Sequence, residues 1–95
     1  MGTYAYECDT KLTFTMAPSA DLSSITLTPT SAQPPFATVH LQKQGDGNVY
    51  MTDPEDAEFV VEGKGETMTI ALGALPTMHC SPVKDPNNAP FNWGE

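Results

Sequence analysis

The chain has 95 residues, enough for one domain, and its 4 Lys+Arg against 12 Asp+Glu give a formal net charge of −8. This charge argues against nucleic acid and anionic membrane surfaces as partners. Hydrophobic residues make up 39% of the chain, too many for a disordered acidic tail and few for a chain that folds around one small core. No apolar run approaches the roughly 18 residues that span a bilayer. No signal peptide follows Met1, so an exported protein would be present here in its mature form.

Short segments alternate between apolar and polar residues, as strands do, and none has the 3.6-residue period of a helix. In chain order the expected strands cover residues 3–8, 11–16, 24–28, 36–42, 48–52, 57–62, 66–72 and a short segment that ends at Cys80. The expected turns lie at 9–10, 17–21, 29–35, 45–47, 53–56, 63–65 and 73–74. The alternation places these residues on the apolar faces of their strands: Tyr4, Tyr6, Cys8, Leu12, Phe14, Met16, Ile25, Leu27, Ala37, Val39, Leu41, Met68, Ile70 and Leu72.

Two cysteines, Cys8 and Cys80, lie near opposite ends of the strand-rich region. A disulfide between them would close most of the domain and would destabilise the unfolded chain by roughly 4 kcal/mol. The alternative is a pair of buried free thiols in a cytosolic protein. We favour the disulfide because the core is small, and it predicts a location outside the cytoplasm.

Eight short antiparallel strands form either a closed up-and-down barrel or a two-sheet sandwich. We favour the barrel, because a Cys8–Cys80 disulfide would then link the first and last strands and closure would leave no exposed edge. The barrel is expected over residues 3–80. Residues 81–95 form a Pro- and Asn-rich tail, which is either flexible or folded back so that Phe91 and Trp93 cover part of the barrel.

The sequence argues against an enzyme. His40 and His79 lie in strands, and no nucleophile motif accompanies them. His79 and Cys80 point to opposite faces of a strand and cannot share one metal ion. The acidic turn at 53–56 lacks the ligand pattern of a calcium loop. Side chains fill a small barrel, so neither a cofactor nor a bound small molecule is expected.

Two surface loops stand out. Residues 44–48 form a polar loop bent by Gly45 and Gly47, and Lys64 stands between two glycines on an otherwise acidic domain. The simplest interpretation of Lys64 is a solubilising lysine in a turn.

A resemblance to a known family favours a different interpretation. Tyr6-Glu7-Cys8, residues 12–16, residues 47–50, Lys64-Gly65 and Cys80 carry it. In these positions the sequence resembles the membrane-bound or periplasmic inhibitors of c-type lysozyme (the MliC/PliC type) of the Gram-negative cell envelope. The resemblance implies an eight-stranded antiparallel barrel, a disulfide, and two loops that enter the lysozyme cleft.

In that family one loop carries a Ser-Gly-x-x-Tyr motif and the other a Lys-Gly pair. Gly47 and Tyr50 match the first motif, whereas Asp46 stands where the family has serine, and Lys64 with Gly65 matches the second. The resemblance implies that the Lys64 ammonium meets the catalytic carboxylates of lysozyme, a charge-assisted contact that strengthens as water leaves the cleft. The expected target-binding residues are Asp46, Gly47, Asn48, Tyr50, Lys64 and Gly65. Of these, Tyr50 is expected to pack beneath its loop.

We therefore expect a periplasmic or outer-membrane-anchored domain that plugs the active-site cleft of a c-type lysozyme and performs no chemistry. Its charge of −8 would steer it toward basic lysozymes. One alternative is a cell-envelope binding module of the same fold with a different partner and no lysozyme inhibition. The other is a small carbohydrate-active or metal-dependent enzyme.

Overall fold

The computed structural model describes residues 2–32, 34, 36–45, 47–52, 55 and 58–93. Across these residues the secondary structure is all strand, and no helix long and apolar enough to cross a membrane occurs there. The strands are β1 (Tyr4–Cys8), β2 (Thr13–Pro18), β3 (Ser24–Pro29), β4 (Val39–Gln44), β5 (Val49–Met51), β6 (Phe59–Lys64), β7 (Thr67–Leu72) and β8 (Met78–Pro82). The all-β prediction is confirmed.

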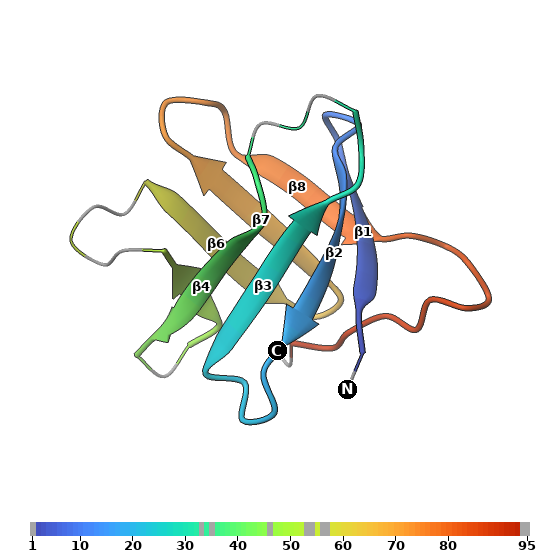
Figure 1. The fold of residues 1–95 in the computed structure, drawn as a ribbon, viewed down its shortest axis with the longest axis horizontal. Helices are drawn as coiled ribbons and strands as arrows, with labels where there is room; N and C mark the ends of the chain where they lie inside the picture. Colours follow the sequence, from blue (N-terminus) through green and yellow to red (C-terminus); the bar gives the residue numbers. More distant parts are fainter. Residues whose placement is uncertain are drawn as a thin grey trace.

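The strands close into an antiparallel barrel (Figure 1). Each strand pairs with the next one in sequence, and β8 pairs with β1, which completes the ring. In that last pairing Cys8 lies opposite Cys80, and a disulfide joins the two residues. The barrel and the disulfide that links its first and last strands are as predicted, and the sandwich is excluded.

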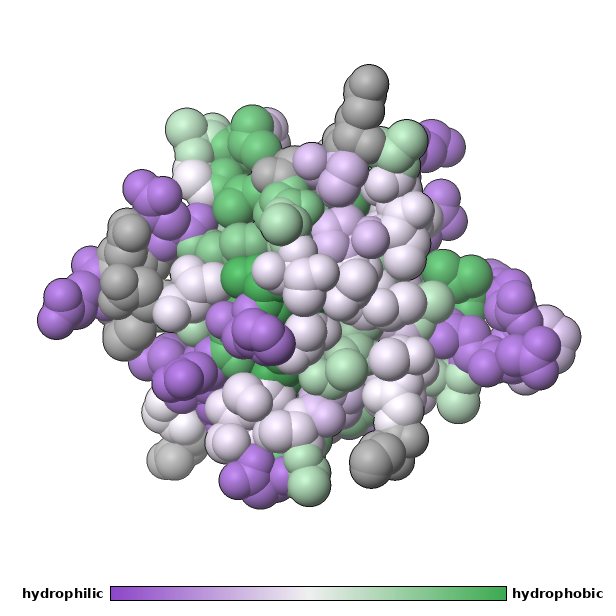
Figure 2. All heavy atoms as spheres, in the orientation of Figure 1, coloured by the Kyte–Doolittle hydropathy of each residue, from purple (hydrophilic) through white to green (hydrophobic). Residues whose placement is uncertain are grey.

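The core fills the barrel, because alternate residues of each strand point inward. Tyr6 and Phe14 face each other across β1 and β2 and stack with ring centroids 5.5 Å apart. The side chains buried most completely are Tyr6, Phe14, Met16, Ile25, Leu27, Leu41, Val61, Met68 and Ile70. Outside the barrel, β2 and β3 present a row of threonines: Thr13, Thr15, Thr26 and Thr28. Much of the front of the molecule in Figure 2 is pale, which marks intermediate hydropathy.

Strand β4 begins three residues later than predicted. The expectation that it starts at Phe36 and points Ala37 inward is wrong, since β4 starts at Val39 and Ala37 is exposed. Prolines precede Phe36 in the sequence, and a proline has no N–H to give to a strand ladder. Phe36 packs edge to face on Phe59 instead, with ring centroids 4.9 Å apart.

Strands β2, β3, β4, β6 and β8 end later than predicted. Strand β2 continues to Pro18, which lies opposite Ile25, and β8 continues past Cys80 to Pro82, which lies opposite Tyr6. In both of these strands the proline is the last residue, where a missing N–H costs the ladder little.

The turn expected at residues 63–65 is shifted. Gly63 and Lys64 belong to β6, and Lys64 pairs with Thr67, so the loop consists of Gly65 and Glu66 alone. Gly65 has a φ of +60°, as the first position of a type II′ hairpin turn requires.

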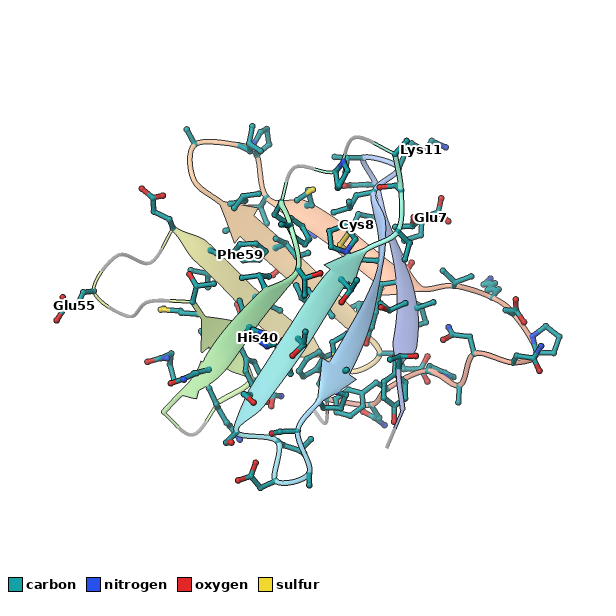
Figure 3. The ribbon with its side chains drawn as sticks, viewed as in Figure 1. Glu7, Cys8, Lys11, His40, Glu55 and Phe59 are labelled. Atoms are coloured by element: carbon teal, nitrogen blue, oxygen red, sulfur yellow. A yellow bond between two sulfur atoms is a disulfide. The ribbon has the colours of Figure 1, made fainter. Side chains whose placement is uncertain are left out.

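In an up-and-down barrel, alternate loops lie at the same end. The β2–β3, β4–β5 and β6–β7 loops meet at the lower end in Figure 1, which we call the loop end. The described chain after β8 runs along this end, where Trp93 is hydrogen-bonded to Gly65. Lys11, in the β1–β2 turn, marks the opposite end in Figure 3.

Candidate functional site

The two loops singled out from the sequence lie side by side at the loop end. Strands β5 and β6 are neighbours, with Val49 opposite Glu62, so the residues just beyond this pair also meet. The Gly63 N–H donates a hydrogen bond of 3.0 Å to the Asn48 carbonyl oxygen. The 47–50 motif and the Lys64-Gly65 pair, separate in the sequence, therefore form one continuous surface.

Lys64 points away from the barrel interior. Along β6 the burial alternates, and Glu62 and Lys64 are on the exposed side. The backbone beneath Lys64 is held in place because the Thr67 hydroxyl donates to the Lys64 carbonyl oxygen at 3.1 Å. Within the part of the chain that the structure describes, the Lys64 ammonium has no ion-pair partner. Lys64 thus has a backbone held in place and an exposed ammonium, which is available to a carboxylate on another molecule.

The other loop is described only in part, since Asp46 lies outside the described residues. Gly45 has a φ of +69°, a conformation that glycine adopts without strain, and Gly47 is exposed. Asn48 is half-buried, and its side-chain Nδ2 donates a 2.9 Å hydrogen bond to the carbonyl oxygen of Trp93. The side-chain amide of Asn48 is thus directed toward Trp93 and not toward solvent.

Tyr50 lies beneath this loop, as expected for a structural residue. Its side chain is buried, and its hydroxyl donates to the Leu22 carbonyl oxygen at 2.9 Å. Burial raises the pKa of the Tyr50 hydroxyl. Because Leu22 belongs to the β2–β3 loop, Tyr50 ties a third loop to the same end of the barrel.

The β2–β3 loop is shaped by Asp21. Its carboxylate accepts hydrogen bonds from the Ser23 hydroxyl at 2.7 Å, the Ser19 hydroxyl at 2.9 Å and the Ser23 backbone N–H at 3.1 Å. The bonds from Ser23, with a further one from Ser19, lower the pKa of Asp21 to about 2. Next to it Leu22 has a φ of +63° and is 42% exposed, which presents an apolar side chain beside the other two loops.

Trp93, at the far end of the chain, completes the loop end. Its indole is 8% exposed, and its backbone N–H donates to the Gly65 carbonyl oxygen at 2.7 Å. Of the two tail conformations expected from the sequence, the folded-back one is the one observed. The sequence offers Trp93 as a cover for part of the barrel but does not predict its hydrogen bonds to Gly65 and Asn48, because those bonds join residues far apart in the chain.

A second concave surface lies at the opposite end of the barrel. It is an open groove of about 380 Å³ with mostly apolar walls, and it coincides with hydrophobic residues near the top of Figure 2. Its walls include Leu12, Leu75, Pro76 and Met78. Among the described residues that line the groove, Lys11 is the one that carries a charge.

The described residues contain no group of three or more His, Cys, Asp or Glu side chains that could hold a metal ion. His40 is exposed on the outside of β4 (Figure 3), where its Nδ1 is hydrogen-bonded to the Thr26 hydroxyl at 2.8 Å. His79 is also exposed, and Cys80 is in the disulfide. Most of the acidic turn at 53–56 lies outside the described residues, which include Glu55 alone.

These features define a disulfide-closed, eight-stranded barrel with three loops gathered at one end and an exposed lysine among them. No protein-family model, curated protein or solved structure matches the chain.

Proposed function

We propose that this domain is an inhibitor protein that binds a c-type lysozyme and blocks its active-site cleft with two loops, without chemistry of its own. The observation that supports this most is the hydrogen bond from Gly63 to Asn48, which brings the two motifs of the resemblance to one end of the barrel. A protein that inserts two loops into one cleft needs both loops on the same side. The fold meets that requirement.

In this proposal Lys64 supplies the central contact. Its ammonium would enter the cleft and approach the catalytic carboxylates of lysozyme, replacing the water that hydrates them. A charge-assisted hydrogen bond gains strength as water leaves the site. Gly65, in the turn that follows the lysine, has no side chain and keeps the tip of this hairpin narrow, so the backbone could follow the lysine side chain inward.

The charge of the chain supports the encounter between the two proteins. At −8 the domain would be drawn toward a basic lysozyme, with an association rate that falls as salt rises. Charge alone does not give specificity, because any acidic protein attracts a basic one. We assign specificity to the loops, and we place the protein outside the cytoplasm, in the periplasm or anchored to the outer membrane. The disulfide and the location of the cell-wall substrate of lysozyme both support that placement.

The test is lysis of bacterial cell walls by lysozyme with the purified domain titrated in, at about 0.15 M salt. A c-type and a g-type enzyme are assayed side by side. The proposal predicts loss of c-type activity as the domain approaches the enzyme concentration, and little change in g-type activity. Equal activity of the c-type enzyme with and without the domain would refute it.

A second candidate is a cell-envelope binding module of the same fold with a different partner. Asp46 favours it, because a carboxylate in the serine position of the family motif would be repelled by the carboxylates of a lysozyme cleft. Binding to lysozyme at low salt that disappears near physiological salt would support this candidate, since charge attraction without shape complementarity behaves in that way.

A further inference from the structure

We infer that Trp93 is a positioning residue that holds the two proposed inhibitory loops, the one that ends at Asn48 and the turn at Gly65, in a fixed position relative to each other. The inference rests on the proposed function for its consequence and on the contacts of Trp93 for its structural part. It assigns a role to residues 83–93, the C-terminal strap, for which the sequence indicated none.

The strap is fastened to the barrel before it reaches the loops. Asn88 uses its side chain as a backbone substitute beside β1: its Oδ1 accepts from the Ala5 N–H at 2.8 Å, and its Nδ2 donates to the Ala5 carbonyl oxygen at 3.1 Å. The same Nδ2 donates to the Val83 carbonyl oxygen at 2.8 Å, which closes the strap on itself. These bonds fix where the rest of the strap crosses the loop end.

Aromatic rings then line the crossing. Phe91 packs edge to face on Tyr4 of β1, with centroids 5.1 Å apart, and on Trp93, with centroids 4.9 Å apart. Trp93 continues the row to Tyr50, 5.7 Å away on β5. The row runs from the first strand to the strand that supports the polar loop, and it places Trp93 against both loops.

Trp93 bonds each loop with one of its two backbone groups. Its N–H donates to the Gly65 carbonyl oxygen at 2.7 Å, and its carbonyl oxygen accepts from Asn48 Nδ2 at 2.9 Å. The backbone of Trp93 thus connects Gly65, in the β6–β7 loop, to Asn48, in the β4–β5 loop.

The indole itself requires Gly63. A Cβ atom at position 63 would overlap ring atoms of Trp93, so β6 can approach the ring only where it has no side chain. This explains a glycine inside a strand, next to the lysine that the proposal uses. The contact between Gly63 and the Trp93 ring thus fixes the position of the β6–β7 hairpin relative to the strap.

The experiment compares Trp93→Ala, Trp93→Phe and a control, Leu75→Ala, at an exposed position on the opposite end of the barrel. The first measurement is the set of backbone amide resonances, which does not depend on any partner. We expect Trp93→Ala to shift the amides of Asn48 and Glu66, because the Glu66 N–H belongs to the peptide group whose oxygen accepts from Trp93. The amides of the β2–β3 pairing should stay in place, and Leu75→Ala should move neither set.

The second measurement is inhibition of the c-type lysozyme. We expect about a tenfold or greater loss for Trp93→Ala, a smaller loss for Trp93→Phe, which keeps a ring in the row, and no loss for Leu75→Ala. Trp93→Phe also serves if the alanine variant does not fold, since its loop amides must then shift. Unshifted loop amides in a folded Trp93 variant, or inhibition equal to wild type, would overturn the inference. A wild-type domain that fails to inhibit would refute the proposed function, while the amide shifts would still decide whether Trp93 positions the loops.

Discussion

The contact between Gly63 and Trp93 predicts a strong energetic coupling that a double-mutant cycle can measure. Replacing a buried tryptophan by alanine typically costs about 3–5 kcal/mol. For Trp93→Ala we expect about 3 kcal/mol, the lower end of this range. Gly63→Ala forces a methyl group into the indole ring and should cost about 2 kcal/mol, within the usual range for overpacking.

The double variant should cost much less than the two single variants together. Once the indole is gone, the methyl group at position 63 occupies the vacated space. In addition, alanine loses less conformational entropy on folding than glycine does. We therefore expect about 3 kcal/mol for the pair instead of about 5, a coupling energy of about 2 kcal/mol.

Urea denaturation followed by far-ultraviolet circular dichroism is the appropriate assay. Trp93 is the only tryptophan, so tryptophan fluorescence cannot follow the variants that lack it. The four proteins must show similar m-values for the comparison to hold. Costs that add to within about 0.5 kcal/mol would show that residue 63 and the indole are independent, which would refute the packing described here.

Three further predictions concern the disulfide, the barrel interior and the unmatched position of the family motif. Replacing Cys8 and Cys80 by serine should lower the free energy of unfolding by about 4 kcal/mol, from the entropy of closing a loop with a sequence separation of 72. Burial raises the pKa of Tyr6 to about 12 from 10.0, so stability should be complete below pH 10 and fall by up to about 1.4 kcal/mol per pH unit between these values. Asp46→Ser should tighten lysozyme binding or leave it unchanged, because it removes a repelled carboxylate.

Each of these has its own control. Chemical reduction of the wild-type domain should reproduce the loss seen with the serine variants, and equal stability with and without the disulfide would contradict the entropic argument. The Tyr6→Phe variant should not lose stability between pH 10 and 12. Its own loss of stability should be small, because the Tyr6 hydroxyl is one of two buried polar groups, with Trp93 Nε1, that have no hydrogen-bond partner among the described residues. A tenfold loss of inhibition in Asp46→Ser would show that Asp46 makes a specific contact with the target.

Much of the barrel could be predicted because its determinants are local. A strand buries every second residue, so the alternation around Phe14 and Met16, or around Met68 and Ile70, predicts both the strand and its inward face. The disulfide could be predicted because only two cysteines are present and the first and last strands must meet to close a barrel.

Several features that the sequence does not predict depend on distant residues. The sequence predicts a turn at Gly63, the usual role of a glycine before Lys-Gly, whereas Gly63 pairs with Met68 within β6. A glycine is required there because the ring of Trp93 leaves no room for a side chain. Phe36 falls on the polar face of the predicted strand, and it packs on Phe59 outside the strand ladder. The role of Trp93 depends on hydrogen bonds to Asn48 and Gly65, and no local pattern in the sequence encodes a bond across that separation.

The central claim is that the loop end, through Lys64, blocks a lysozyme cleft. The most direct test measures the inhibition constant for a c-type lysozyme at about 0.15 M salt with Lys64→Ala and with Lys11→Ala. Both variants remove one exposed positive charge, but Lys11 lies at the opposite end of the barrel (Figure 3). We predict a loss of at least about tenfold for Lys64→Ala, more than about 1.4 kcal/mol, with no comparable loss of stability, and wild-type inhibition for Lys11→Ala. Equal inhibition constants for the two variants would contradict the account.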